Sequence, residues 1–510
     1  MSHTGEVPPA VPPGGEDLRL RSLLRNWISL AGLALAAVAF INIILLFAMD
    51  IISAHPNPYI GIFAYVIMPA ILIAGLLLVP LGIWRTRNRL RSGDPSVPRF
   101  PRLDLNNPAQ RSTVAFFMSF VVLFVLLSAI GSYRAYEYSD STEFCGQLCH
   151  SVMHPEFTAH QASPHARVGC VDCHVGEGAG WYVRSKLSGA RQVFKTALGT
   201  FPRPIETPVA NLRPAPETCE QCHWPKKFWG AQLKVINHFG YDEKNTPRQL
   251  QMLIKTGGGD PNQGVATGIH WHMNIGNTIT YASDPKRQNI PYVKIKNSNG
   301  AETEYWAEGA GEAQIKGMQQ RSMDCVDCHN RPTHIYMAPD KAVDQSMTAH
   351  RIDNSLPYAK QQAVTVLAAD YASTSEALQA IETKIPAYYK ETYPDIASSR
   401  QQQIQAMVTE LKAIFQRTRF PEMKVDWRTH ADNIGHFNSP GCFRCHDGNH
   451  KSKDGKVITK DCNVCHSMLG QEEGGVKVLG GDTNALFKHP VEIGDLSAVN
   501  CTDCHTGGPQ

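Results

Sequence analysis

The chain lacks any unpaired cysteine in its sequence pattern. All 14 cysteines fall into seven pairs, and a histidine directly follows the second cysteine of every pair. Zinc sites would use such pairs two at a time and would not need a histidine always at the same place. The pattern therefore argues against zinc knuckles. The seven sets are Cys145/Cys149/His150, Cys170/Cys173/His174, Cys219/Cys222/His223, Cys325/Cys328/His329, Cys442/Cys445/His446, Cys462/Cys465/His466 and Cys501/Cys504/His505.

Six of these sets have the spacing C-x-x-C-H, and the first has one more residue between its cysteines. C-x-x-C-H is the spacing of c-type haem attachment, in which two thiols form thioethers with the porphyrin and the histidine binds the iron. We therefore predict seven covalently bound haems c. Seven haems leave little ordinary apolar core, so we expect the haem region not to fold without them.

Charge is missing from three long apolar runs, at 26–49, 51–84 and 112–133, apart from His55 in the second. A run of about 20 apolar residues is long enough to span a bilayer. The first run is too long for the apolar part of a signal peptide, and a second span follows it. The sequence predicts three transmembrane helices and a retained signal anchor rather than a cleaved leader.

Lysine and arginine are absent from the loop around His55, whereas arginines precede the first span and fill the loop 85–111. Positively charged loops stay in the cytoplasm. We therefore predict a multi-pass protein of the bacterial cytoplasmic membrane, with a cytoplasmic N-terminus and periplasmic haem domains. This orientation places every motif on the side where c-type haems are attached.

No motif lies between His329 and Cys442, and this gap divides the periplasmic part. Within it, apolar residues recur with helical spacing from Tyr358 to Phe420, interrupted at Pro386 and Pro394. Short strands are expected at 278–281 and 292–296. The predicted fold class is mostly α with many loops. The expected segments are a disordered tail (1–25), three transmembrane helices (26–136), a four-haem domain (137–340), a helical spacer (341–425) and a three-haem domain (426–510).

Each iron needs a second axial ligand besides its motif histidine, and twelve other histidines follow the third span. A lone histidine is usually solvated or hydrogen-bonded, but a haem beside every motif favours ligation. Bis-histidine haems have both iron faces filled and carry electrons. The candidates closest in sequence to a motif are His165, His334, His436, His450 and His489, followed by His238 and by one of His270 or His272. Met153, three residues after His150, is a candidate at the first haem, with a buried core methionine as the alternative.

Two stretches carry a family resemblance: Ser141-Thr-Glu-Phe-Cys145 after the third span, and Cys325-Val-Asp-Cys-His-Asn-Arg-Pro-Thr-His334. With the motifs between them, they resemble the NapC/NirT/NrfH family of membrane-anchored quinol dehydrogenases over residues 113–340. The whole arrangement, with three spans and a C-terminal three-haem extension, is similar to the heptahaem inner-membrane cytochromes of metal-reducing bacteria.

The resemblance implies a menaquinol pocket beside the first haem, with Met153 as that haem's ligand and His334 as a ligand to another haem. It also implies that Lys186 contacts the quinol, although Lys186 could instead meet lipid phosphate. The chain departs from the family in the spacing of its first motif, in the position of Met153, which is displaced by one, and in having no Asp or Glu from 179 to 205. The proton acceptor is therefore sought among Glu137, Asp140, Glu143 and a haem propionate.

The expected function is menaquinol oxidation, with electrons passing along the haems to periplasmic c-type cytochromes in anaerobic or extracellular respiration. One alternative is a reductase of nitrite or a similar small substrate at an open iron, although the C-x-x-C-K motif common in such enzymes is absent. Another is an electron-transfer subunit of a larger membrane complex (a haem-wire subunit), which has no quinone site of its own. The expected partners are the quinone pool, the lipid bilayer and periplasmic cytochromes; nucleic acid is not expected, and the oligomeric state is not predicted.

Overall fold

The computed structural model describes residues 26–52, 67–91, 105–148, 150–175, 179–209, 212–258, 267–273, 276–480, 487–494 and 499–509. The predicted tail 1–25, the loop around His55 and residues 92–104 of the arginine-rich loop lie outside this part. The chain forms two compact units, residues 1–140 with 177–186, and residues 141–176 with 187–510.

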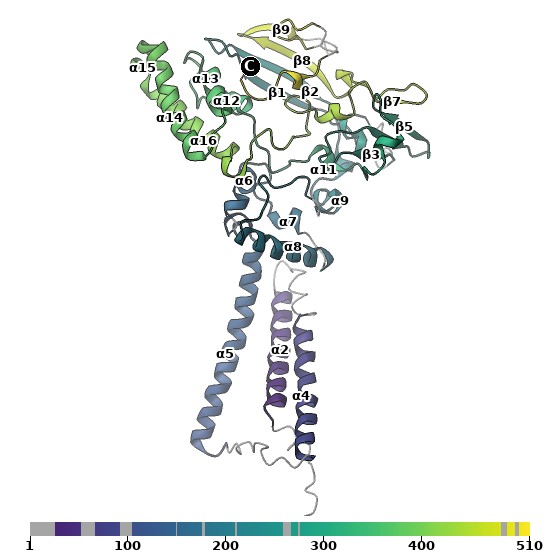
Figure 1. Ribbon diagram of the computed structural model, residues 1–510, viewed down its shortest axis with the longest axis vertical. Helices are drawn as coiled ribbons and strands as arrows, with labels where there is room; N and C mark the ends of the chain where they lie inside the picture. The colour runs from purple at the N-terminus through teal and green to yellow at the C-terminus, as the bar shows by residue number, and fades with distance from the viewer. Residues whose placement is uncertain are drawn as a thin grey trace, which may run out of the picture. The chain divides into compact units, whose positions relative to one another are not determined.

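The first unit contains three long helices, α2 (Trp27–Ile52), α4 (Met68–Arg91) and α5 (Pro108–Ser139) (Figure 1). Their apolar segments 27–46, 68–89 and 108–131 are long enough to cross a membrane, as the sequence predicted. Helices α2 and α4 pack closely through glycines, since a Cβ added to Gly32 would lie 2.6 Å from the carbonyl oxygen of Gly75. The expected boundary of the arginine-rich loop needs correction, because α4 continues as far as Arg91.

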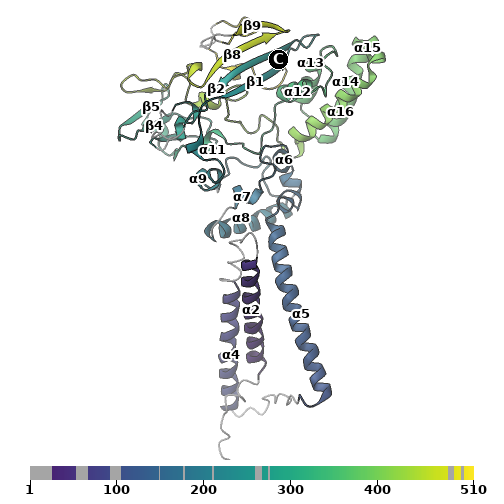
Figure 2. The same ribbon diagram turned by 180° about the vertical axis from the view of Figure 1, so that it is seen from behind.

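Most helices of the second unit are short and belong to connections or motifs, whereas those between residues 339 and 418 form one cluster (Figure 2). Helix α8 begins in the first unit and ends in the second. The helices are α6 (His150–Gln161), α7 (Cys170–His174), α8 (Ala179–Ala197), α9 (Ala215–Thr218), α10 (Glu312–Ile315), α11 (Cys325–Cys328), α12 (Pro339–Thr348), α13 (Ala359–Ala368), α14 (Thr374–Thr392), α15 (Pro394–Ser399) and α16 (Gln401–Thr418).

Two antiparallel sheets lie in the second unit, with strand orders β1-β2-β8-β9 and β6-β3-β4-β5-β7. Each sheet combines strands from before and after the helical cluster: β2 pairs with β8, and β5 with β7. The expected four-haem and three-haem segments are therefore joined by shared sheets. The strands are β1 (Gln232–Phe239), β2 (Pro247–Ile254), β3 (Thr278–Ser283), β4 (Tyr292–Lys296), β5 (Glu302–Trp306), β6 (Gln319–Ser322), β7 (Lys451–Ser452), β8 (His466–Glu473) and β9 (Val476–Gly480).

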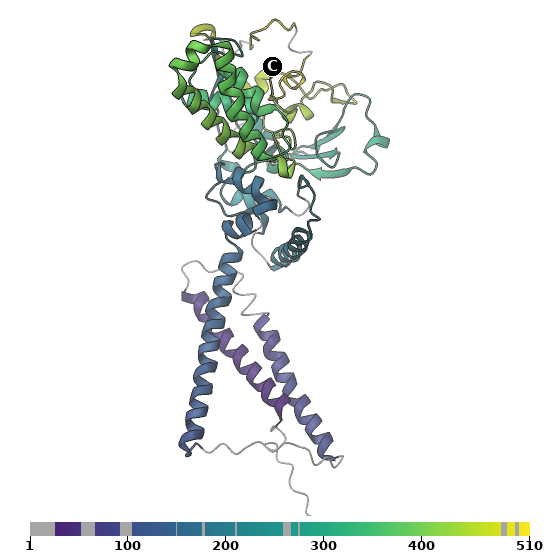
Figure 3. The same ribbon diagram turned by 60° about the vertical axis from the view of Figure 1, so that its left-hand side comes forward.

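Helices α12 to α16 enclose a hydrophobic core of their own (Figure 3). Leu367 of α13, Ile381 and Tyr389 of α14 and Leu411 of α16 are all buried there. The expectation that Pro386 breaks this region is wrong, because α14 continues through it. A proline inside a helix costs about 3 kcal/mol, and the burial of Ile385 and Tyr389 on either side offsets that cost.

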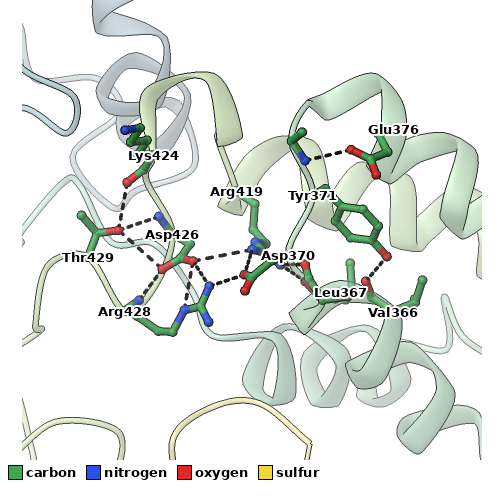
Figure 4. Close-up of polar contacts among 12 residues, drawn as sticks. Val366, Leu367, Asp370, Tyr371, Glu376, Arg419, Lys424, Asp426, Arg428 and Thr429 are labelled. Atoms are coloured by element: carbon green, nitrogen blue, oxygen red, sulfur yellow. Dashed lines mark hydrogen bonds and ion pairs between the residues drawn. The ribbon is translucent and has the colours of Figure 1, made fainter.

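The end of this cluster is fixed by the buried guanidinium of Arg419, directly after α16 (Figure 4). Its Nη1 donates to the carbonyl oxygens of Leu367 and Ala369 at the end of α13. Its Nη2 lies 3.6 Å from Asp426, which also pairs with Arg428. This network holds the chain as it leaves the cluster toward the fifth motif.

Candidate haem centres

Each motif outside the first is built on a single helical turn. The backbone N–H of the motif histidine donates to the carbonyl of the first cysteine at His223, His329, His446 and His505, over 2.8 to 3.0 Å. The turn keeps both thiols and the imidazole close enough together to bind a single haem. Three of the turns are capped by an aspartate immediately before the second cysteine, whose carboxylate accepts from a backbone N–H: Asp172 at Gly169, Asp327 at Asp324 and Asp503 at Asn500.

The cysteines predicted to bind haem differ in their exposure. Cys222, Cys462 and Cys504 are exposed, whereas the other described motif cysteines are half-buried. Attachment of these cysteines to haem stays a prediction from the motif spacing.

The extra residue of the first motif lies in a π-helical turn, Phe144–Leu148. A π turn closes over five residues instead of four, so it accommodates one more residue between the cysteines. Gly146 is packed against the ring of Phe157, and a Cβ at this position would lie 2.0 Å from Phe157 Cδ2. Cys149 and the side chain of His150 lie outside the described residues, whereas Met153 is half-buried in α6.

Six motif histidines each face a histidine from a distant part of the chain. Two metal–nitrogen bonds of about 2 Å, together with the distance from each nitrogen to its ring centre, separate two imidazoles on one metal by about 6 Å. All six pairs have this spacing, so the residues present fit haem iron between two imidazoles. The distances between ring centres are His174–His334 6.3 Å, His223–His165 6.0 Å, His329–His270 6.3 Å, His446–His272 5.8 Å, His466–His436 6.3 Å and His505–His489 6.1 Å.

Backbone carbonyls fix the tautomer of many of these rings. A carbonyl oxygen can only accept, so the Nδ1 that it contacts carries the proton and Nε2 is the nitrogen available to a metal. Burial, followed by the charge of Arg331, lowers the pKa of His334 to about 3, which keeps this imidazole neutral. The Nδ1 contacts are His165 to Pro332, His270 to Thr256, His272 to Ile269, His334 to Glu156, His446 to Thr459 and His489 to Val491.

Neighbouring pairs are linked through short contacts. His270 and His272 share the 3-10 helix Ile269–Met273, yet they face the fourth and fifth motif histidines. Phe443, inside the fifth motif, stacks on His436 of the sixth pair with ring centres 4.2 Å apart. Nδ1 of His436 lies 3.8 Å from Cys501 Sγ in the seventh motif. The fourth to seventh centres therefore follow one another in chain order.

The earlier centres are linked in the same way. The Nδ1 of His165, in the third pair, contacts the carbonyl of Pro332, two residues before His334 of the second pair. A hydrogen bond with Cys145 lowers the pKa of the Cys170 thiol to about 6, so the first and second motifs are neighbours. Burial, followed by the charge of Cys219, raises the pKa of Cys325 to about 11, because the third and fourth motifs lie close together.

The fourth motif is held by Asp327, which is 2% exposed. Its Oδ1 accepts from the hydroxyl of Tyr281 at 2.6 Å and from Nε of Arg321 at 2.8 Å. Its backbone carbonyl accepts from Arg444 of the fifth motif at 2.8 Å. The aspartate thus joins two motifs to strands β3 and β6, a role that its position in the motif did not reveal.

A second hydrogen-bond network surrounds His334. The hydroxyl of Tyr336 donates to Glu156 Oε1 at 2.9 Å, and Nε of Arg331 donates to the carbonyl of His334 at 2.7 Å. Burial raises the pKa of Glu156. Within the described residues, Glu156 Oε2 and Arg331 Nη2 are buried without a hydrogen-bond partner. Sequence reasoning missed both residues, although Arg331 lies inside the stretch that carried the family resemblance.

Two other candidate ligands, His450 and His238, do not face a motif histidine. His450 is 2% exposed, its Nδ1 contacts Asp447 at 2.9 Å and its Nε2 contacts the carbonyl of Ile290 at 2.7 Å. Neither nitrogen is left for iron, so His450 drops out of the ligand set. Nδ1 of His238 contacts Asp344 at 2.9 Å, which leaves its Nε2 available, but the ring of His238 faces Phe437 rather than a motif histidine.

The residues expected at the quinol site lie on several elements. Glu137 is on α5 and pairs with Arg134 at 2.8 Å. Asp140 and Glu143 follow α5, the first half-buried and the second exposed. Lys186 is in α8, and its side chain lies outside the described residues. These four residues stay a prediction, whereas the structure brings together six pairs of histidines.

Comparison with known proteins identifies the chain. The profile of the NapC/NirT cytochrome c family, N-terminal region, matches residues 107–207, and that of cytochrome c3 matches residues 435–509. Cytochrome c-type protein ImcH of Geobacter sulfurreducens is 48% identical over 487 residues, which cover 94% of this chain and 95% of that protein. No solved structure matches. The chain belongs to the ImcH-like, NapC/NirT-type family of membrane-anchored multihaem cytochromes c.

Proposed function

We propose that this cytochrome oxidises menaquinol at the outer face of the cytoplasmic membrane and passes the electrons along seven haems, in chain order, to periplasmic c-type cytochromes. The observation that carries the proposal is the set of six imidazole pairs, each with the spacing of two ligands on one metal. Each haem, when bound, takes up and releases one electron. The paired imidazoles and the thiols of the last six motifs hold six haems, and Cys145, Cys149 and His150 hold the first.

Contacts between successive pairs support transfer in chain order. The shared helix of His270 and His272 keeps the fourth and fifth centres adjacent, and Phe443 and Cys501 do the same for the later ones. Two imidazoles of such a pair would fill both faces of the iron that they hold, which favours electron transfer over substrate binding. No observation favours the nitrite reductase alternative.

At the first haem, we propose Met153 as the second ligand and Lys186 as the contact for a quinol hydroxyl. Menaquinol oxidation releases two electrons and two protons, so the site needs a proton acceptor as well as an iron. Asp140 and Glu143 follow the third span directly and are the nearest carboxylates in sequence to Cys145. Glu137 is already paired with Arg134, which makes it the weaker candidate.

The proposal is tested on the full-length, haem-loaded protein in nanodiscs. Mixing with a reduced menaquinol analogue should reduce the haems, as followed by their visible absorption. Lys186→Gln should slow this reduction by about tenfold, as expected for losing one hydrogen bond of about 1.5 kcal/mol, while reduction by dithionite stays complete. Lys390→Gln, on the exposed face of α14, is the matched control.

Absence of quinol-dependent reduction in the pure protein would contradict the quinol site. If adding membrane partner proteins restored the reaction, the chain would be a haem-wire subunit that receives its electrons from a partner's quinone site. An electron paramagnetic resonance titration tests the ligand set separately, with six bis-histidine low-spin signals and one distinct first haem expected. High-spin signals from the last six haems would be incompatible with the pairs.

A further inference from the structure

Helix α8, Ala179–Ala197, has its apolar side turned outward. Leu187, Phe194 and Leu198 are spaced by seven and four residues, so they form one stripe along the helix and its end. Their exposed fractions are 68%, 70% and 73%. Ser188 and Gly189, on other sides of the helix, are among its half-buried positions. A helix that packs on the core of its own protein instead buries its apolar residues and exposes its polar residues.

Positive charge accompanies the stripe. Arg184 and Arg191 are exposed, and Lys195 lies one turn after Arg191. No Asp or Glu occurs from 179 to 205, so no acidic side chain within this stretch neutralises them. Trp181 lies beneath Arg184, with the guanidinium carbon 5.5 Å from the ring centre. A basic, amphipathic helix with an exposed apolar stripe and an aromatic residue is typical of a helix at the membrane interface.

We propose that α8 lies in the outer lipid surface of the membrane, with Leu187, Phe194 and Leu198 among the acyl chains and its arginines and Lys195 on anionic phospholipid headgroups. Two observations select lipid over a protein partner. The charge is of one sign and complements an anionic lipid surface. The helix also follows the third transmembrane span in the same chain, so a bilayer is always available to it. The assignment does not depend on quinol oxidation.

The test uses the photo-reactive amino acid p-benzoylphenylalanine in the full-length protein, placed at Phe194 or, as the matched control, at Gln192. Gln192 is exposed on the same helix but lies away from the stripe. After irradiation of native membranes, we expect phospholipid adducts at position 194 in about tenfold higher yield than at position 192. Mass spectrometry of the intact chain confirms that all haems are attached in both variants.

Adducts of position 194 with another polypeptide, or with a second copy of this chain, would overturn the proposal, as would equal lipid yields at both positions. The charge is tested in nanodiscs of phosphatidylcholine with added phosphatidylglycerol. We expect phosphatidylglycerol to be enriched among the adducts beyond its share of the lipid, and the double variant R191Q/K195Q to abolish this enrichment. Adducts in simple proportion to the lipid mixture would overturn the headgroup assignment.

Discussion

Replacing His272 with methionine leaves every thioether in place and changes one ligand of one iron. Methionine raises the reduction potential of a haem relative to histidine. We therefore expect the haem at His446 to shift upward by on the order of 0.1 V, while the other haems keep their potentials. A redox titration followed by electron paramagnetic resonance measures this, because a histidine–methionine haem has its own low-spin signal.

His450→Gln is the matched control for that experiment. Both of its nitrogens are engaged by Asp447 and Ile290, so its loss should leave every haem signal where it was. A changed haem signal in this variant would show that His450 is a ligand after all, and would return it to the set that sequence proximity favoured.

Gly146 is the residue on which the unusual first motif depends. An alanine there would place Cβ 2.0 Å from the ring of Phe157, so the π-helical turn would have to open and the two thiols would separate. We expect Gly146→Ala to lose one haem, giving six by mass spectrometry of the intact protein. The double variant G146A/F157A should regain the seventh. If the double variant stays at six, the steric explanation is wrong.

The motifs themselves could be predicted from sequence, because thioether attachment is a local property of a few residues. The contacts that hold each turn could not, since they depend on which other parts of the chain pack there, as Tyr281 and Arg321 do at Asp327. The pairing of distal histidines also joins residues far apart in the chain. His334 follows the fourth motif closely but faces His174 of the second. Sequence proximity therefore does not say which motif a histidine faces, and it does not reveal the contacts of His450 with Asp447 and Ile290.

At the scale of elements, Asp344 joins helices α12 and α13 to strand β1. Its carboxylate accepts from Nζ of Lys360 at 2.6 Å and from the backbone N–H of Phe239 at 3.0 Å. Both charged side chains are buried. Asp344→Ala would leave the lysine charge unpaired, and we expect it to lower the free energy of unfolding by about 3–5 kcal/mol.

The double variant D344L/K360M removes both charges and should lose much less stability than the single one. Urea unfolding, followed by far-ultraviolet circular dichroism, compares the two. Equal losses in the single and double variants would mean that the hydrogen bond to β1, rather than the buried charge, dominates the energy of this contact.

For the whole molecule, the arrangement of motifs suggested two haem domains separated by a spacer, but the sheets cross that division. Alternation along β3 and β4 was visible in the sequence, whereas the pairing of β2 with β8 was not. Strand pairing depends on which edges meet after the intervening helices have packed, and the chain between these two strands contains the whole helical cluster. The helical core itself was predictable, because its apolar positions recur with helical spacing.

Truncation tests whether the two haem groups are one folding unit. A chain that stops at Phe420 lacks β8, so β2 loses a partner paired along it from Arg248 to Ile254, and the fourth motif loses its contact with Arg444. An exposed strand edge and a loosened motif favour aggregation and proteolysis. We expect this chain not to accumulate with four haems. A chain that stops at Gly480 keeps both sheets and should accumulate with six, counted by haem-stained gels and mass spectrometry of isolated membranes. Stable accumulation of the four-haem chain would show instead that the part with the first four motifs folds alone. Strands β7, β8 and β9 would then join sheets that are already folded.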